Sequence, residues 1–406
     1  MAFLGGCLGS EISRLLTIQG SLFQVATDDA LSQIVFKALT QPNNINTAFN
    51  FGLYMPNKME ISPYCEEHMP KILELWKNQY QTELSNTGSL PNTWSLRSNE
   101  IKAFLRGQSR HEHFAVATKG GEVVGYMFFQ VFPFHGEATA FCPIMGHAER
   151  GTRREVLERL YQNLSEGLVA KGVLSHIITY FAHDKVVEDA VFALGFGLVV
   201  IDAFRGTKHI QSISSPVGVQ VVKATPDNVC DVKDLGEETR KYYIRAPIFL
   251  NRSSKPQEYY QGLLGSSDMA VYLAFVEELP VGFMSVRRSE ELRFVDLCDT
   301  KTALIDEVGA YIKPAYRGRN IGSALLSRCL EWCRLNEITV VHVDFESANL
   351  LARPFWLKFF TETLKSAKRT VYSDAISTQQ RRARFGIHKR DQKSSSSDLL
   401  HTRESV

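Results

Sequence analysis

The stretch from Ile312 to Leu326 combines residue types that can hold a phosphate group. Arg317, Gly318, Asn320 and Gly322 follow one another closely between an extended run and a helical pattern. Glycine adopts a left-handed backbone at little cost and asparagine tolerates one, so this turn can direct successive N–H groups at one point. The following helix adds unpaired N–H groups and the positive end of its dipole. The stretch therefore predicts a pyrophosphate site, where a nearby arginine adds a charge-assisted contact.

The elements on either side of this turn limit the type of site. An extended run from Leu304 to Tyr311 precedes it, and a helix is expected to continue to about Asn336. No Gly-Lys-Ser/Thr closes a P-loop, and the GxGxxG dinucleotide fingerprint is missing. The turn resembles motif A of the Gcn5-related N-acetyltransferases, the GNAT superfamily, whose acyl-CoA signature is Arg/Gln-x-x-Gly-x-Gly/Ala. Arg317 and Gly322 match that signature, while Asn320 replaces its middle glycine.

The resemblance implies an acyl-CoA-dependent N-acyltransferase that transfers acetyl from acetyl-CoA to an amine by direct attack in a ternary complex. The amine would belong to a small molecule or to a protein N terminus or lysine. No metal ligand set appears in the sequence. The residues expected to bind acetyl-CoA are those of the turn and its flanks, with an asparagine beyond the next strand: Ile312, Arg317, Gly318, Arg319, Asn320, Ile321, Gly322, Ser323 and Asn349. Asn349 has the alternative role of capping a helix that starts there.

The resemblance also directs attention to the strand before the turn, because such enzymes need a base for the ammonium and an acid for the thiolate. Asp306 and Glu307 are the candidate bases, and strand alternation sends them to opposite faces, so at most one faces the cleft. A solvated carboxylate at a strand end is an equal alternative for each. The family often has a tyrosine hydroxyl near the CoA sulfur, but Trp356 stands at that position. Tyr311, Tyr316 or water would then assist the thiolate, or it would leave unassisted.

The composition is ordinary for a globular protein. The chain has 406 residues, of which 44% are hydrophobic and 22% charged, and its formal net charge is +2. This near-neutral charge gives no electrostatic field that would attract nucleic acid or a membrane surface. No apolar run approaches the length of a membrane-spanning helix. The seven cysteines show no CxxC pair, which fits a reducing, cytoplasmic location. The sequence leaves open whether the protein forms a homodimer.

The chain repeats one unit. Val123 to Phe129 and Val281 to Val286 are expected second strands of two hairpins, and their glycine-aromatic pairs start 157 residues apart (282 minus 125). The resemblance to tandem GNAT proteins predicts an α/β fold with two tandem GNAT-like domains, each a mixed, mostly antiparallel sheet flanked by helices. The expected segments are an N-terminal extension at 1–57, a degenerate GNAT-like domain at 58–206, a GNAT acetyltransferase domain at 217–373, and a disordered, basic and serine-rich tail at 374–406. Whether the extension is ordered or disordered is left open.

The first copy departs from the phosphate-binding pattern. His147 to Glu155 stands where its turn would be, and only Gly151 remains of the glycines. Glu149 and Glu155 would repel phosphate, so one CoA per chain is expected, at the second copy.

Two other functions remain open. One is a non-catalytic acyl-CoA sensor of GNAT fold, which the missing tyrosine and the uncertain base favour. The other is an aminoacyl-transferring relative that uses charged tRNA, against which the near-neutral charge and the CoA-type turn argue.

Overall fold

The computed structural model describes residues 58–109, 113–208, 215–306 and 309–373. The predicted extension at 1–57 and the predicted tail at 374–406 lie outside these residues. The chain from Met59 onward belongs to one compact unit. Within the described ranges, no helix is long and apolar enough to cross a membrane.

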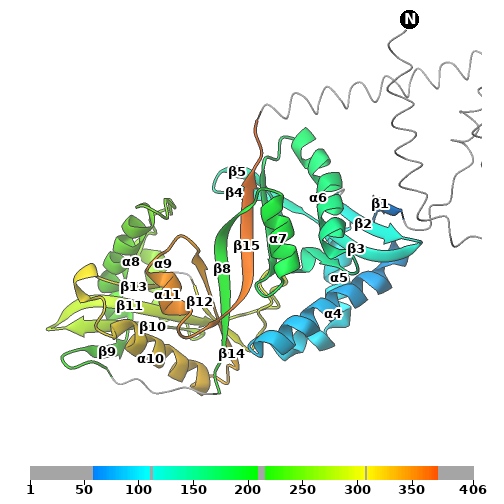
Figure 1. Ribbon diagram of the computed structural model, residues 1–406. Helices are drawn as coiled ribbons and strands as arrows, with labels where there is room; N and C mark the ends of the chain where they lie inside the picture. Colours follow the sequence, from blue (N-terminus) through cyan, green and yellow to red (C-terminus); the bar gives the residue numbers. More distant parts are fainter. Residues whose placement is uncertain (1–57, 110–112, 209–214, 307–308, 374–406) are drawn as a thin grey trace, which may run out of the picture. The chain divides into compact units, whose positions relative to one another are not determined.

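The first copy starts with a strand and two helices, continues with five strands, and ends with helices and strands in alternation (Figure 1). Its elements are β1 (Met59–Pro63), α4 (Met69–Thr87), α5 (Ser98–Gln108), β2 (Phe114–Lys119), β3 (Glu122–Phe128), β4 (Gln130–Phe134), β5 (Glu137–Cys142), β6 (His147–Glu149), α6 (Arg153–Ala170), β7 (Ser175–Phe181), α7 (Lys185–Ala193) and β8 (Gly197–Gly206). The amphipathic α6 buries Val156, Leu157 and Leu160 against β2 and β3. Its apolar stripe recurs at helical spacing, which is why this segment forms a helix.

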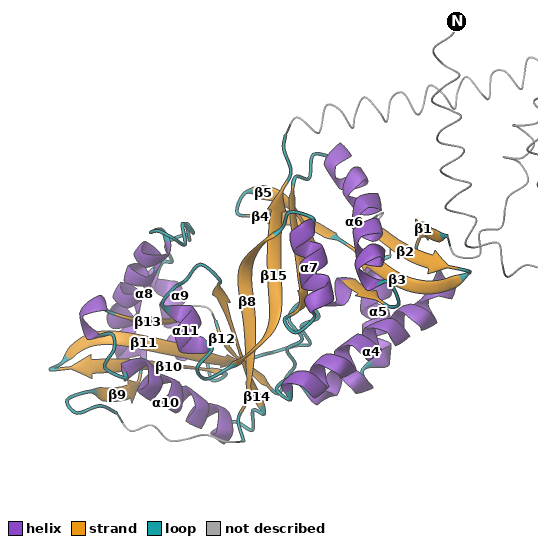
Figure 2. Ribbon diagram, viewed as in Figure 1, coloured by secondary structure: helices purple, strands orange, loops and turns teal. Residues whose placement is uncertain are grey.

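The second copy repeats this order, except that one strand, β11, stands where the first copy has β3 and β4 (Figure 2). Its elements are β9 (Gln220–Lys223), α8 (Val229–Tyr243), α9 (Gln257–Gly265), β10 (Met269–Val276), β11 (Leu279–Arg288), β12 (Thr302–Ile305), β13 (Ala310–Ile312), α10 (Ile321–Leu335), β14 (Val340–Glu346), α11 (Ala352–Trp356) and β15 (Thr361–Thr370). The expected single strand from Leu304 to Ile312 is thus two short strands. Cys329 and Cys333 are fully buried on α10, as their one-turn spacing predicts.

The two copies share details that composition alone would not produce. Each starts its first helical segment with the same local hydrogen bond. The Cys65 N–H donates to His68 Nδ1 at 3.2 Å, and the Thr225 N–H donates to Asn228 Oδ1 at 3.1 Å. The two starting residues are 160 positions apart (225 minus 65). The repeat is therefore one of structure as well as of sequence landmarks.

A glycine occupies the same register position in each copy. Gly125 of β3 lies opposite Glu149, and Gly282 of β11 lies opposite Ile312. A Cβ at Gly125 would lie 2.4 Å from a methyl carbon of Val156, and a Cβ at Gly282 would lie 2.7 Å from a backbone carbonyl oxygen of the facing strand. Both positions need glycine because another element packs directly against the backbone.

The strands of the two copies are exchanged. The described residues form a four-stranded sheet, β1-β2-β3-β6, and an eleven-stranded sheet that runs β4-β5-β7-β15-β8-β14-β12-β11-β10-β9, with β13 beside β11. The last strand of the first copy, β8, is antiparallel to β14 of the second. The last strand of the second copy, β15, is antiparallel to β7 of the first. In Figure 1 the orange β15 lies beside the green β8, so each copy completes its sheet with the other's strand.

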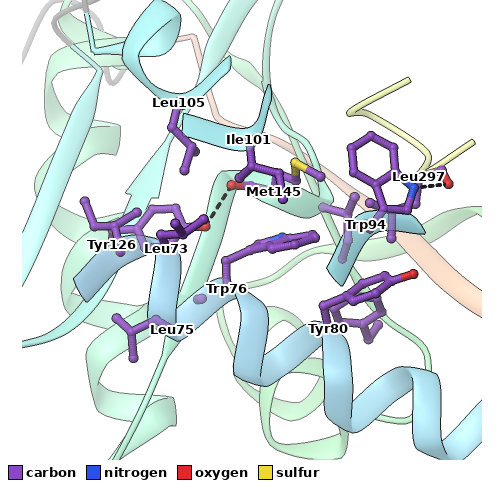
Figure 3. Packing of buried hydrophobic residues seen from close by; sticks show 14 of the residues in the cluster. Leu73, Leu75, Trp76, Tyr80, Trp94, Ile101, Leu105, Tyr126, Met145 and Leu297 are labelled. Atoms are coloured by element: carbon purple, nitrogen blue, oxygen red, sulfur yellow. Dashed lines mark hydrogen bonds between the residues drawn. The ribbon is translucent and has the colours of Figure 1, made fainter. Parts of the chain in front are cut away.

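The large hydrophobic core of the first copy also reaches into the second. Figure 3 shows Trp94 beside Leu297, a residue of the second copy, in the same cluster as Trp76. The Trp94 indole N–H donates to the Leu297 carbonyl at 2.6 Å, and the neighbouring Thr93 hydroxyl donates to Asp299 Oδ2 at 2.5 Å. These contacts fix the loop before β12, which is the strand that leads into the site.

Candidate active site

A cleft opens where two parallel strands diverge. β12 pairs with β14 from Thr302, opposite Val340, to Ile305, opposite Val343. The strand breaks after Ile305, the end of β12, and resumes at Ala310, the start of β13, just after Gly309, which has φ 70°. After the break β13 pairs with β11 and no longer with β14. The edge of β13 that faces β14 is therefore free of a strand partner among the described residues, and a cleft of about 390 Å³ occupies the gap.

The predicted phosphate turn forms the mouth of this cleft. Asn320 has φ 60° and ψ 10°, the left-handed conformation that its place in the motif requires, and Gly318 has φ 75°. The amides of residues 318–323 donate to no acceptor in the described part of the chain, since the first intrahelical bond is from Ala324 N to Asn320 O. Six N–H groups thus collect at the start of α10, which is the arrangement that anions bind.

Gly322 permits a close contact at the same place. A Cβ there would lie 3.0 Å from Phe355 Cε2 and 3.3 Å from Ile312 Cδ1, and all three residues line the cleft. Glycine therefore lets α10 approach both β13 and α11. The predicted CoA-binding residues Ile312, Arg317, Gly318, Asn320, Ile321, Gly322, Ser323 and Asn349 all line this one cleft.

The two predicted arginines lie on aromatic rings. Arg317 donates through Nε to the Ile312 carbonyl at 2.9 Å, and its guanidinium carbon lies 5.2 Å and 5.5 Å from the ring centroids of Tyr242 and Tyr311. Arg319 lies over Tyr316 in the same way and is not part of the cleft lining. Arg317 therefore joins the turn to β13.

Of the three predicted catalytic residues, the structure places one in the cleft. Tyr311 lines it, and burial followed by the charge of Glu238 raises the pKa of its hydroxyl. Asp306 lies at the break between β12 and β13, where both of its carboxylate oxygens accept from Arg287, at 2.8 Å and 2.5 Å. It does not line the cleft. Glu307 falls outside the described residues.

Asn349 and Trp356 close the far side of the cleft. Asn349 is 3% exposed, and its Oδ1 accepts from the Tyr242 hydroxyl at 2.9 Å and from Ala352 N at 3.1 Å. It thereby satisfies the first amide of α11, so the helix-capping role is formed and its Nδ2 remains for a ligand. Trp356 lines the cleft and packs at right angles to Phe360, with 5.5 Å between ring centroids.

Sequence reasoning missed one cleft residue, Asp344 of β14. Burial, followed by the charge of Asp202, raises its pKa to about 6. Asp344 is nevertheless open to water by surface area. The raised pKa and the exposed surface are compatible, because a carboxylate in the wall of a cleft touches water on one side and is surrounded by protein on the others. The alternation of valines with His342, Asp344 and Glu346 was the available signal, because it places these polar side chains on one face of a strand.

The equivalent region of the first copy is filled by its own side chains. Glu149 on β6 is 7% exposed, accepts from His147 Nδ1 at 2.7 Å and lies near Arg153. Arg153 also pairs with Asp184. Glu149 is equivalent to Ile312 by strand register, so the first copy has a buried carboxylate and its partners where the second copy has an isoleucine that lines the cleft. Among the described residues, no group of three or more His, Cys, Asp or Glu side chains could hold a metal ion.

Comparison with known proteins decides the family of the second copy. The sequence of residues 236–360 matches the acetyltransferase (GNAT) family. This part of the chain is a GNAT domain. Acetyl-CoA is the co-substrate of that family, and the diverging strands and free amides fit its pantetheine and pyrophosphate. No curated protein matches the sequence significantly.

The fold comparison extends across both copies. The chain is similar to a GCN5-related N-acetyltransferase from Sphaerobacter thermophilus, with a TM-score of 0.50 and 12% identity over 78% of this chain and 98% of that one. Weaker matches include a tandem GNAT protein from the clavulanic acid biosynthesis pathway, with TM-score 0.42 and 15% identity over 77% and 98% of the two chains. Another is the glucosamine N-acetyltransferase region of a fungal multi-domain β-N-acetylglucosaminidase, with TM-score 0.45 and 12% identity over 78% and 38%. At 12% identity the first of these comparisons shows the fold alone, and the α/β fold with two GNAT-like domains agrees with the prediction.

Proposed function

We propose that the GNAT domain transfers an acetyl group from acetyl-CoA to an amine that attacks the thioester directly. The observation that carries the proposal is the union, in one cleft, of the free edge of β13 with the unpaired amides of residues 318–323. The amides are positioned for the pyrophosphate, and the free edge offers backbone donors and acceptors to pantetheine. The thioester would then lie beside Tyr311 and Ile312.

Release of the thiolate would proceed without a strong acid. Trp356 occupies the position at which the family often has tyrosine, and an indole N–H donates a hydrogen bond but not a useful proton. Tyr311 holds its proton firmly because its pKa is raised. A hydrogen bond from Tyr311 would stabilise the leaving sulfur, while the full proton would come from the attacking nitrogen or from water.

We further propose that the GNAT-like domain at 58–206 is structural and that the domain at 217–373 is catalytic. The buried carboxylate of Glu149, at the position equivalent to Ile312, opposes a bound phosphate there and supports one acetyl-CoA per chain. The exchange of β8 and β15 supports a first copy that the second needs for a complete sheet. A cytoplasmic enzyme that needs no metal, nucleic acid or membrane for this reaction is part of the same proposal.

The second candidate function is an acyl-CoA sensor without turnover. Trp356 and the ion pair that engages Asp306 favour it, since each removes a group that the reaction could use. Turnover separates the two functions. Acetyl-CoA is incubated with glucosamine, spermidine, tyramine and a peptide with a free N terminus, and thiol release is followed together with the mass of each amine.

An acetylated amine supports the enzyme, whereas tight acetyl-CoA binding with no acetylated amine in a wider amine library supports the sensor. Gly322→Val is the matched binding-deficient variant, because its side chain would enter the space between α10 and Phe355. It should lose acetyl-CoA binding under either function. Unchanged affinity in this variant would contradict the location of the site.

A further inference from the structure

We infer that Asp344 is the general base that accepts the ammonium proton of the acceptor amine. The inference rests on the proposed transferase function and names a residue that the family signature does not contain. The observations behind it are the position of this carboxylate on β14 and the absence of a side-chain partner for it among the described residues.

β14 presents its residues to two different environments. One environment is the hydrophobic core that β14 shares with α10, which contains Val341, Val343 and Phe345. Asp344 alternates with them and therefore points to the opposite face. It is one residue beyond Val343, the last residue of β14 that pairs with β12, so it stands where the strands have separated. From there its carboxylate faces the same space as the backbone of Ala310 to Ile312.

The neighbouring carboxylates are all engaged. Asp306 accepts from Arg287, Glu346 accepts from Arg252 at 2.8 Å, and Asp202 accepts from His342 Nε2 at 2.9 Å. Asp344 has no hydrogen bond or ion pair to its side chain from the described residues. An ion pair makes a carboxylate less basic, and Asp344 is the carboxylate of the described cleft lining that has no such pair.

The charges around Asp344 suit it to the task. Asp202 of β8 lies directly opposite it in the strand register, and directly opposed side chains share a face of the sheet. His342, Glu346 and Asp306 also act on it, and Tyr243 is near. Burial and the repulsion from Asp202 outweigh the attraction to His342, so the carboxylate titrates at about 6. It is then ionised at neutral pH yet more basic than an ordinary aspartate, which is the condition for proton transfer.

The reaction written with this base is balanced. Asp344 takes one proton from the ammonium and leaves a neutral amine. The amine nitrogen forms a bond to the thioester carbonyl carbon, the C–S bond breaks, and sulfur leaves with its electron pair. The second proton of the attacking nitrogen passes to the thiolate, and Asp344 releases its own proton to water. The products are an amide, free CoA and one proton.

The position of β8 gives the first copy a part in this chemistry. Asp202 belongs to the first copy by sequence, yet it pairs with His342 and lies opposite Asp344 in the second. It acts through other residues, so it is a positioning residue rather than a catalytic one. The strand exchange is what brings it there.

The experiment compares Asp344→Asn with wild type in the full chain, with an amine from the panel that wild type acetylates. Turnover should fall by ~10²–10⁴-fold, and the acidic limb of the wild-type pH–rate profile, centred at about 6, should disappear. The acetyl-CoA dissociation constant from calorimetry should stay within about threefold, a difference of less than one kcal/mol. Asp344→Glu, which keeps a carboxylate, should recover part of the rate and the limb. Asp268→Asn removes an exposed carboxylate outside the cleft and should change neither.

The outcomes separate the two proposals. If Asp344→Asn keeps the wild-type rate and profile, the inference is wrong while the transferase stands. If the loss appears in Asp306→Asn instead, the base is Asp306 and the inference is equally overturned. If wild type acetylates no amine although it binds acetyl-CoA, the transferase proposal fails, and the inference fails with it. Thermal unfolding shows whether each variant is folded, and Asp344→Asn should be at least as stable as wild type because it removes the repulsion between Asp344 and Asp202.

Discussion

Gly282→Ala perturbs the strand that we propose holds pantetheine. The added Cβ would lie 2.7 Å from the Tyr311 carbonyl oxygen, 3.0 Å from Ile312 Cγ1 and 3.3 Å from Ile312 Cα. Two of these three atoms are backbone, so no side-chain rotation relieves the contact. β13 has to move away from β11 by a few tenths of an ångström or more, and it moves into the cleft.

The size of the effect follows from two terms. Overpacking of this kind costs about 1–3 kcal/mol of stability. A shift of β13 also misaligns its hydrogen bonds to pantetheine, each of which contributes ~0.5–1.5 kcal/mol net. Loss of two such bonds amounts to about 1–3 kcal/mol, or roughly 5- to 150-fold weaker acetyl-CoA binding.

Gly125→Ala is the matched control, since it changes the equivalent glycine in the first copy. Its Cβ would lie 2.4 Å from Val156 Cγ1 and 3.2 Å from the Ala148 carbonyl. It should lower the melting temperature and leave acetyl-CoA affinity unchanged. Calorimetric titration and thermal unfolding of both variants provide the test. If Gly282→Ala is destabilised like Gly125→Ala but binds acetyl-CoA as wild type does, β13 is not the pantetheine strand.

Three further predictions concern the same region. Calorimetry with acetyl-CoA should give one site per chain, and two equivalent sites would mean that the first copy is functional. Trp356→Tyr should restore a hydroxyl near the thioester and keep acetyl-CoA affinity within about threefold; a larger loss would show that the indole itself binds the cofactor. Burial opposes a charge on His342, but the hydrogen bond and charge of Asp202 prevail and raise its pKa to about 8. Because this pKa is raised, the stabilisation is full below about 6.5 and is lost as the pH rises through 8, by about 2 kcal/mol in all. Urea unfolding should show this fall in the free energy of unfolding between pH 6.5 and 8, and His342→Gln should reduce it. An equal fall in the variant would mean that the His342–Asp202 pair is not its cause.

The local chemistry of the turn could be predicted because it depends on neighbours in sequence. Asn320 has the left-handed backbone that its place in the motif required, and the glycines at 125 and 282 marked the repeat. The buried cysteines of α10 followed from helical spacing. Each of these features is set within one or two turns of chain.

Features that depend on distant residues could not be predicted. Alternation places Asp344 on the polar face of β14 but does not say that β12 stops pairing one residue earlier. Asp306 was a candidate base by its place on the strand before the turn, but its pairing with Arg287 depends on the register of β11 against β12. The partners of β8 and β15 are not encoded in their own patterns, because any strand with one apolar face can pair at either edge of a sheet.

The exchanged strands set an order of events during synthesis. β7 ends at Phe181, and its neighbour β15 starts at Thr361, 180 residues later (361 minus 181). At ~5–20 residues per second, the ribosome needs about 10–40 s to make that length. During this interval β7 has either an open edge or a temporary neighbour, and an open edge pairs readily with another chain. The first copy therefore cannot reach its final sheet before the last strand of the second copy has left the ribosome, so neither copy folds to completion as an independent unit.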